Sequence, residues 1–263
     1  MSSQFPDADT VRTVLTLAAR APSVHNSQPW RWRVGPDGLH LYADPSRQLP
    51  KTDPDRRDLL ASCGAALHHC AVALAALGWQ AQIRRFPNPA DRDHLASIEV
   101  HRQRAGDLDI TLAAAITRRR TDRRNYSAWP VPGGDIALMG ARAARAGVML
   151  RQIDLLPHLT AIFAQSVDDN AGLIALGTET DDDMARLRAG EATSLVLLSA
   201  TAMGLATCPV TEPLEIAETR EAVRADVFGT SGYPQMMLRV GWAAVGADPL
   251  PATPRRPLSE MVG

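Results

Sequence analysis

The chain has 263 residues, of which 45% are hydrophobic, and its 28 Lys and Arg residues nearly balance its 29 Asp and Glu residues. This length and composition suit one sizeable domain, or two small half-domains that share a core, and they argue against a disordered chain. A net charge of −1 provides no overall field for concentrating nucleic acid or an anionic membrane, so neither is an expected partner and any anion site must be local.

The N-terminal residues, MSSQFPDADT, are polar and acidic, which argues against a secretory signal, and no apolar run approaches the ~20 residues of a membrane span. The three cysteines, Cys63, Cys70 and Cys208, are dispersed and do not describe a disulfide framework. We therefore expect a cytoplasmic protein with reduced thiols.

Hydrophobic periodicity predicts alternating helices and strands along the chain. The first helix follows Asp9, a suitable N-cap, and a GPDG turn between two alternating segments indicates a β-hairpin. The predicted helices are Thr10–Arg20, Asp58–Leu77, Leu108–Arg119, Ile136–Ala146, Leu155–Gln165 and Asp181–Leu205. The predicted strands are Trp30–Val34, Leu39–Ala43, Ile83–Phe86, Ser97–Val100, Val148–Ile153, Leu173–Gly177 and Met236–Trp242. The tail after Ala247 is too rich in proline to be regular.

The two longest predicted helices suggest an internal repeat. Gly64 and Gly78 bracket thirteen residues of the first helix, and Gly190 and Gly204 bracket thirteen residues of the second. A turn and a proline-containing segment follow each helix. A duplicated sequence would explain this correspondence, but so would two unrelated buried helices built mostly from small and apolar residues.

The strongest local signal is the segment 21–32, APSVHNSQPWRW. Its two prolines fix the backbone around Ser, His, Asn and Gln side chains, which bring amide and hydroxyl groups to the end of a helix. Such groups suit the polar edge of a flat heterocycle. The alternative is a structural loop whose Asn and Ser side chains cap neighbouring backbone.

A second signal is the segment 118–126, RRRTDRRNY, which places five arginines within seven residues at the end of a predicted helix. Guanidinium groups and the Thr121 hydroxyl would fit a phosphate dianion, although a basic cluster of this kind is also typical of a solvated surface. Arg255 and Arg256, held between prolines, form a smaller cluster with the same two interpretations.

Together these segments resemble the nitroreductase superfamily, over nearly the whole chain. Its members carry an APSxxNxQPW loop and an RRSxR-like segment, and they are homodimers with FMN between the subunits. Here each motif occurs once, the loop in the first half and the Arg-rich segment at the start of the second. This layout is similar to that of the mycobacterial Acg-type proteins, in which two halves are fused, and so are the segments SCGAAL, RRFPNP, HLASIE, GLATC and ATPRRP.

The resemblance implies an α+β, nitroreductase-like fold with two pseudo-symmetric halves, residues 1–105 and 106–263, each with a central mixed sheet flanked by long buried helices. It also implies a gene duplication, one FMN per chain and a monomer, because each motif occurs once where a homodimer would contain two copies.

The resemblance also assigns three groups of residues to FMN. Those for the phosphate and ribityl chain are Arg119, Thr121, Arg123, Arg255 and Arg256. Those for the isoalloxazine ring are in the loop: Pro22, Ser23, Val24, Asn26 and Gln28. Those near the reactive face are Pro209, Thr211 and Glu212. The superfamily often has an acidic residue and a glycine in this last group, so PVTEP departs from the pattern and leaves backbone donation to flavin N5 open.

The implied activity is reduction of FMN by NAD(P)H, followed by reduction of a nitro compound, a quinone or a similar acceptor. Because the flavin supplies the hydride chemistry, no catalytic side chain and no metal are expected. The alternative is a non-catalytic protein that holds FMN under stress.

Five other residues have competing interpretations. His25 could tune the flavin or simply pack, whereas Cys63 and Cys70, one heptad apart, are better explained as core residues than as metal ligands. Trp30 and Trp32 are expected in the core, and not as stacking platforms, because they alternate into a strand. The passage from 166 to 172 is shorter than in Acg-type relatives, so the chain either has no lid over the flavin or lacks a segment.

Overall fold

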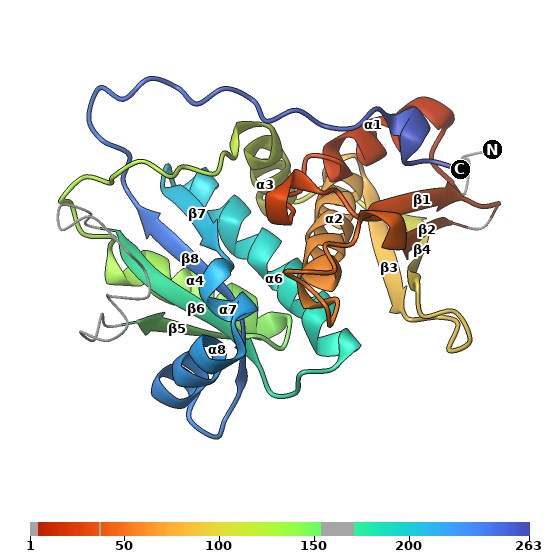
Figure 1. Ribbon diagram of the computed structural model, residues 1–263. Helices are drawn as coiled ribbons and strands as arrows, with labels where there is room; N and C mark the ends of the chain where they lie inside the picture. The colour runs from red at the N-terminus through yellow and green to blue at the C-terminus, as the bar shows by residue number, and fades with distance from the viewer. Residues whose placement is uncertain (1–4, 37, 154–170) are drawn as a thin grey trace. The chain divides into compact units, whose positions relative to one another are not determined.

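The computed structural model describes residues 5–36, 38–153 and 171–263. Its elements form two compact units, Met1–Thr117 with Pro254–Gly263, and Arg118–Thr253 (Figure 1). These bounds differ from the expected halves, 1–105 and 106–263, because almost all of the helix after residue 106 and the C-terminal segment belong to the first unit. The helix predicted at Leu155–Gln165 lies outside the described residues.

The first unit is built on a four-stranded antiparallel sheet. Its elements are α1 (Ala8–Ala18), the short 3₁₀ helix η1 (Val24–Asn26), β1 (Trp30–Val34), β2 (Leu39–Ala43), η2 (Pro45–Arg47), α2 (Arg57–Ala76), β3 (Trp79–Arg85), β4 (His94–Arg102), α3 (Asp107–Arg118) and the C-terminal η4 (Leu258–Glu260). The strand order is β1-β2-β4-β3. Thus the predicted hairpin is confirmed with its expected bounds.

One face of this sheet is apolar. Trp30 and Trp32 of β1 are buried, whereas Arg31 and Arg33 between and after them are exposed, as the two-residue period of a strand requires. Helix α2 packs against β2 and β3, and α1 packs on α2. The tryptophans are therefore core residues, as predicted.

The second unit has an antiparallel sheet of the same order, β5-β6-β8-β7. Its elements are α4 (Gly133–Arg145), β5 (Met149–Ile153), β6 (Gly172–Thr178), α6 (Asp183–Ala202), β7 (Ala206–Val210), α7 (Glu212–Glu215), α8 (Ala217–Val223), the π-helix η3 (Arg224–Phe228) and β8 (Tyr233–Gly241). Both units thus run through a helix, two paired strands, a long helix and two more strands. The second unit adds α7, α8 and η3 between its last two strands.

The two long helices correspond closely. Helices α2 and α6 each contain 20 residues, and Gly64 and Gly190 each stand at the eighth of them. Each helix ends just before a glycine with positive φ, 84° at Gly78 and 85° at Gly204. Glycine adopts this left-handed conformation without the steric cost that a Cβ atom brings, so it ends a helix efficiently.

Both faces of the second sheet are covered by apolar side chains. Ile174 and Leu176 of β6 contact residues of α4 and α6 on one face. Leu173 and Ala175, which point to the opposite face, pack with Leu214 and other residues of the α7–η3 region. Strands β6 and β8 are therefore buried almost throughout, which explains their nearly continuous apolar sequences.

All named strands pair antiparallel. Among the described residues, the parallel pairing expected of mixed sheets is limited to isolated bridges between Trp32 and Val262 and between Thr121 and Thr207. Each bridge joins a segment of irregular backbone to a named strand, β1 or β7, and so attaches that segment to the edge of a sheet.

Helix α2 is long and apolar enough to cross a membrane by length and composition, with a mean hydropathy of 1.6. No such stretch was predicted from the sequence. However, 78% of that apolar stretch is buried within the protein, as expected for the central helix of a folded unit. Cys63 and Cys70 are among its buried residues, in agreement with their predicted place in the core.

Candidate functional site

The loop between α1 and β1 has an unusual backbone. Of the five non-glycine residues with positive φ in the described part of the chain, three lie within four positions here: His25 (49°), Asn26 (56°) and Gln28 (50°). Each such residue costs about 1–2 kcal/mol relative to an ordinary conformation, least for Asn. The surrounding contacts must therefore hold the loop in this shape, and strain of this kind is typical of binding sites.

Side chains of the loop stabilise its own turn. The backbone amide of Gln28 donates to Oγ of Ser23 at 2.9 Å. The side-chain Nε2 of Gln28 donates to the carbonyl of Asn26 at 3.2 Å. From α2, Oγ of Ser62 accepts from the amide of Val24 at 3.4 Å. Two of the predicted flavin-ring residues, Ser23 and Gln28, thus shape the loop directly. His25 is exposed, and Pro22 is partly exposed.

The C-terminal arginines lie on this loop. Nη1 of Arg255 donates to Oδ1 of Asn26 at 3.1 Å, and Nδ2 of Asn26 donates to the carbonyl of Pro254 at 3.2 Å. The amide of Arg256 donates to Oε1 of Gln28 at 2.9 Å. The structure therefore brings together two predicted groups, the loop residues and the tail arginines.

In the second unit, the Arg-rich segment runs beside β7. Thr121 forms a parallel bridge with Thr207, and the amide of Asp122 donates to the carbonyl of Thr207 at 2.9 Å. The same strand ends at Val210, just before Thr211 and Glu212. The Arg-rich part of the predicted phosphate group and the predicted reactive-face residues therefore belong to neighbouring segments of this unit.

The Arg-rich segment is fastened by its own acidic residue. Nε and Nη2 of Arg124 donate to the two carboxylate oxygens of Asp122 at 3.0 and 2.7 Å, and these hydrogen bonds hold the pKa of Asp122 below its usual range. Nη1 of Arg124 also donates to the carbonyl of Asp248. The hydroxyl of Tyr126 donates to the carbonyl of Asp122 at 2.8 Å.

The predicted phosphate residues of this segment differ in exposure. Arg119 is buried and Thr121 is half-buried, whereas Arg123 is exposed and makes no hydrogen bond or ion pair with the residues that the structure describes. Burial raises the pKa of Cys208, and the positive charges of Arg123 and Arg239 oppose that shift. Arg123 therefore contributes positive charge that acts on Cys208 of β7.

The predicted reactive-face residues lie at the end of β7 and directly after it. Pro209 pairs with Leu238 within the sheet, and the hydroxyl of Thr211 donates to Oε1 of Glu215 at 2.9 Å. Glu212 is exposed at the start of α7, a helix of four residues. The acidic side chain of Glu212 is thus accessible, while the Thr211 side chain is occupied within the segment.

Arg239 is a further candidate site residue that was not predicted from the sequence. It is largely buried on β8, its Nη2 donates to the carbonyl of Arg124 at 3.2 Å, and its guanidinium lies 4.7 Å from the ring centroid of Tyr126. A single charged residue within the apolar strand QMMLRVG was the available signal, because a buried charge is rarely kept without a partner.

Comparisons with known proteins point to one family. The profile of the Nitroreductase family matches residues 159–242. The chain is 56% identical to “Putative NAD(P)H nitroreductase Rv3131” of Mycobacterium tuberculosis over 321 residues, covering 100% of this chain and 93% of that protein. It is 33% identical to “Putative NAD(P)H nitroreductase acg” of the same organism over 331 residues, covering 99% and 97% of the two chains.

These alignments are longer than the 263 residues of this chain, so the relatives contain segments that have no counterpart here. Among solved structures, the chain is similar to a “putative nitroreductase” from Anabaena variabilis, with a TM-score of 0.58 and 9% identity over 92% of this chain and 90% of that one. At this identity the likeness concerns the fold alone.

Proposed function

Because this chain belongs to the nitroreductase family, we propose that it is a cytoplasmic FMN-dependent oxidoreductase that uses NAD(P)H to reduce nitro compounds, quinones or similar acceptors. The names of its relatives support the reductant and the acceptor class. Bound FMN would supply the hydride transfer, and the chain would supply binding and orientation. No side chain is proposed as a general acid or base.

The observation that carries this proposal is the exposure of Arg123 on a fixed segment of backbone. The segment around it is fixed by the Asp122–Arg124 pair and by the bridge to Thr207, while Arg123 itself remains exposed. A guanidinium held on a fixed backbone, with its donors free, suits a phosphate oxygen. We assign Arg123 to the FMN phosphate, with Arg119 and the Thr121 hydroxyl as further ligands.

The loop of the first unit would contact the flavin ring. Pro22, Ser23, Val24 and Asn26 expose part of their surface, and the strained backbone presents them on a defined turn. Pro209, Thr211 and Glu212 are proposed near the reactive face of the ring. Because the Thr211 hydroxyl is already bonded to Glu215, its contribution would come from the backbone.

The test is direct. Purified protein should be yellow and should release FMN on denaturation, which chromatography of the supernatant would identify. If the protein is colourless and takes up no added FMN, the proposed function is wrong.

The repeated topology of the two units supports a duplication within one chain. Since each cofactor motif occurs once, we propose one FMN per chain and a monomer. Light scattering combined with flavin quantitation should give one flavin for each 28.3 kDa chain. Two flavins per chain would contradict this assignment.

A further inference from the structure

The contacts between the loop and the C-terminal segment converge on Gln28. This residue is buried, only 4% exposed, although its φ lies in the left-handed region. Its Oε1 accepts from the amide of Arg256, and its Nε2 donates to the carbonyl of Asn26. Both ends of the side-chain amide are therefore committed to the protein.

The Arg256 guanidinium is committed in the same way. Nη1 donates to the carbonyl of Gln28 at 3.1 Å, and Nη2 donates to the carbonyl of Glu260 at 2.8 Å. Nε faces the Glu260 carboxylate at 3.4 Å, and Asp44 lies within 3.9 Å of Nη1. All three nitrogens of the guanidinium thus contact protein atoms, and the side chain is only 12% exposed.

The C-terminal segment then continues along β1. The amide of Trp32 donates to the carbonyl of Met261 at 2.6 Å, and the amide of Gly263 donates to the carbonyl of Trp32 at 3.0 Å. Together with Arg255 on Asn26, the segment contacts the loop at Asn26 and Gln28 and the strand that follows it. Contacts on both sides of Pro29 would resist relaxation of the left-handed backbone.

We propose that Pro254–Gly263 acts as a clasp on the loop, and that Gln28 and Arg256 are positioning residues that affect flavin binding through the shape of the loop, without touching the phosphate. The clasp itself follows from these contacts. Its effect on flavin rests on the proposed function.

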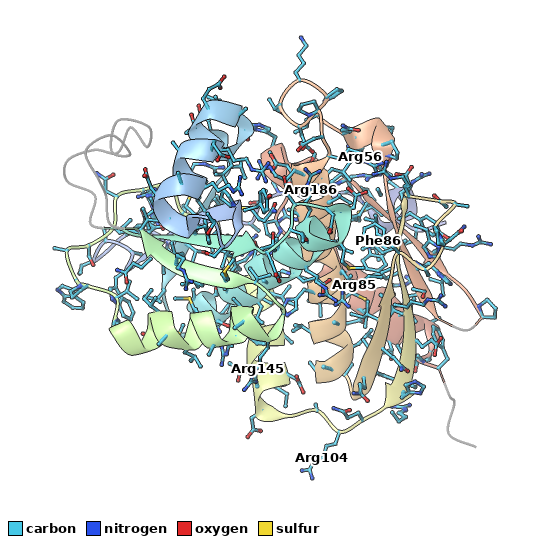
Figure 2. All side chains as sticks on the ribbon, turned by 90° about the horizontal axis from the view of Figure 1, so that it is seen from below. Arg56, Arg85, Phe86, Arg104, Arg145 and Arg186 are labelled. Atoms are coloured by element: carbon cyan, nitrogen blue, oxygen red, sulfur yellow. The ribbon has the colours of Figure 1, made fainter. Side chains whose placement is uncertain are left out.

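Hydrogen exchange tests the clasp without flavin. In Arg256→Ala and in Gln28→Met, which keeps the size of the side chain but not its hydrogen bonds, the amides of 23–32 and 258–263 should exchange about tenfold faster in the flavin-free protein. Helix α2 should keep its protection, which shows that the fold is intact. The matched control is Arg104→Ala, because Arg104 is exposed and points away from the ribbon (Figure 2). Unchanged exchange in both variants would refute the clasp.

Flavin binding separates positioning from phosphate contact. If Arg256 positions the loop, Arg256→Ala should weaken FMN and riboflavin by the same factor, about tenfold. Arg256→Lys should behave like the alanine variant, since an ammonium cannot reproduce the forked contacts. Loss of FMN alone, with rescue by Lys, would assign Arg256 to the phosphate and overturn the proposal.

The two proposals fail in different ways. If the wild-type chain binds no flavin but the exchange results hold, the proposed function is wrong and the clasp stands. If FMN binds and neither variant changes exchange or affinity, the clasp is wrong and the proposed function stands.

Discussion

At the scale of single residues, neighbouring arginines of the 118–126 segment have different roles. Arg124 is paired with Asp122 and bonded to the carbonyl of Asp248, so it holds the segment in place. Arg123, one position earlier, is exposed and forms no such bond with the described residues. Their identical chemistry makes them a matched pair for mutation.

Replacing Arg123 with Ala should weaken FMN binding by roughly tenfold to a hundredfold, because a charge-assisted contact contributes about 1.5–3 kcal/mol. Riboflavin lacks the phosphate, so its binding should hardly change. Fluorescence titration with both flavins measures the two affinities. Equal losses for FMN and riboflavin would mean that Arg123 shapes the pocket and does not hold phosphate.

Arg124→Ala should instead lower the stability of the flavin-free protein. The flavin-free protein should melt at a lower temperature than the wild type, because Asp122 loses its partner, whereas Arg123→Ala should melt as the wild type does. Differential scanning calorimetry of the two flavin-free variants decides the point. If Arg124→Ala leaves the melting temperature unchanged, the segment is held by other contacts.

Some residue assignments could not be read from local sequence. The cap of the first helix is Asp7, whose Oδ1 accepts from the amide of Thr10 at 2.8 Å, and not Asp9, because two acidic residues stand close together there and only geometry distinguishes them. The loop partners of Arg255 and Arg256, which are Asn26 and Gln28, lie more than 220 residues away in sequence, so no local pattern identifies them. The APSVHNSQPW loop, by contrast, is recognisable from its composition.

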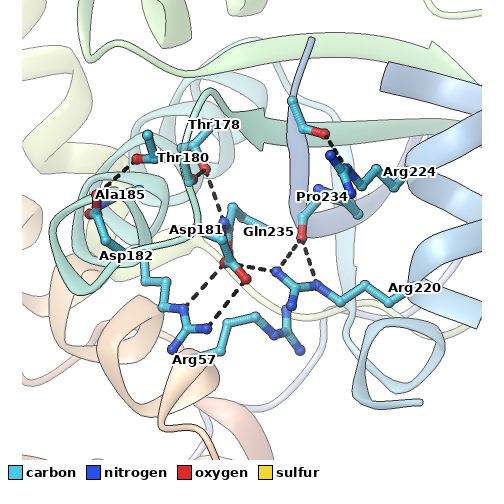
Figure 3. Close-up of polar contacts among 12 residues, drawn as sticks. Arg57, Thr178, Thr180, Asp181, Asp182, Ala185, Arg220, Arg224, Pro234 and Gln235 are labelled. Atoms are coloured by element: carbon cyan, nitrogen blue, oxygen red, sulfur yellow. Dashed lines mark hydrogen bonds and ion pairs between the residues drawn. The ribbon is translucent and has the colours of Figure 1, made fainter. Parts of the chain in front are cut away.

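At the scale of elements, a carboxylate joins four segments of the second unit (Figure 3). Asp181, between β6 and α6, accepts from Nη2 of Arg220 on α8 at 2.9 Å, from Nε2 of Gln235 on β8 at 2.9 Å, and from Arg186 on α6. Burial raises the pKa of Asp181, but these hydrogen bonds outweigh burial and lower it to about 2. The ionised group therefore ties the connection between β6 and α6 to α6, α8 and β8.

Asp181→Asn should lower the free energy of unfolding at neutral pH by about 1–2 kcal/mol, allowing for solvent screening of a partly exposed group. A lowered pKa stabilises the fold above the ordinary carboxyl pKa near 4, and that stabilisation is lost as the pH falls toward 2. The difference between wild type and variant should thus shrink below pH 4. Urea unfolding between pH 7 and pH 3 measures it, and a difference that does not change with pH would exclude this role.

Gly78→Ala should lower the free energy of unfolding by about 1 kcal/mol, because alanine is strained at a φ of 84°. A Cβ atom there would lie 3.5 Å from the carbonyl of Gln103, an ordinary contact, so the cost arises from the backbone and not from a clash. Gly204→Ala should behave similarly if the two helix ends are equivalent. Chemical denaturation of both variants would show whether they are.

Elements with a strong period were predictable, and those set by tertiary contacts were not. The hairpin and the long helices were placed within a few residues. The second long helix was predicted to run from Asp181 to Leu205, but it ends at Ala202, and Ala206–Val210 forms the unpredicted strand β7. Gly204 was the available stop signal. The short helices α7 and α8 also went unpredicted, because segments of four and seven residues carry little periodicity.

At the scale of the whole molecule, the chain passes between its two compact units at residues 117–118 and again at 253–254. The second passage returns Pro254–Gly263 to the first unit, where it contacts the loop. The expected division into two consecutive halves could not include this return, since the proline-rich tail predicts only that the segment is irregular. Its bridge to β1, between Val262 and Trp32, joins it to residues near the opposite end of the chain.

We propose that this member of the nitroreductase family turns over through bound FMN. The most direct measurement is an anaerobic titration of the FMN-loaded protein with NADPH, and in parallel with NADH, followed at the visible flavin absorbance. We expect rapid bleaching by at least one reductant and recovery of the absorbance when a nitro compound or quinone is added. Flavin that stays oxidised with both reductants would contradict turnover and favour a protein that only holds FMN.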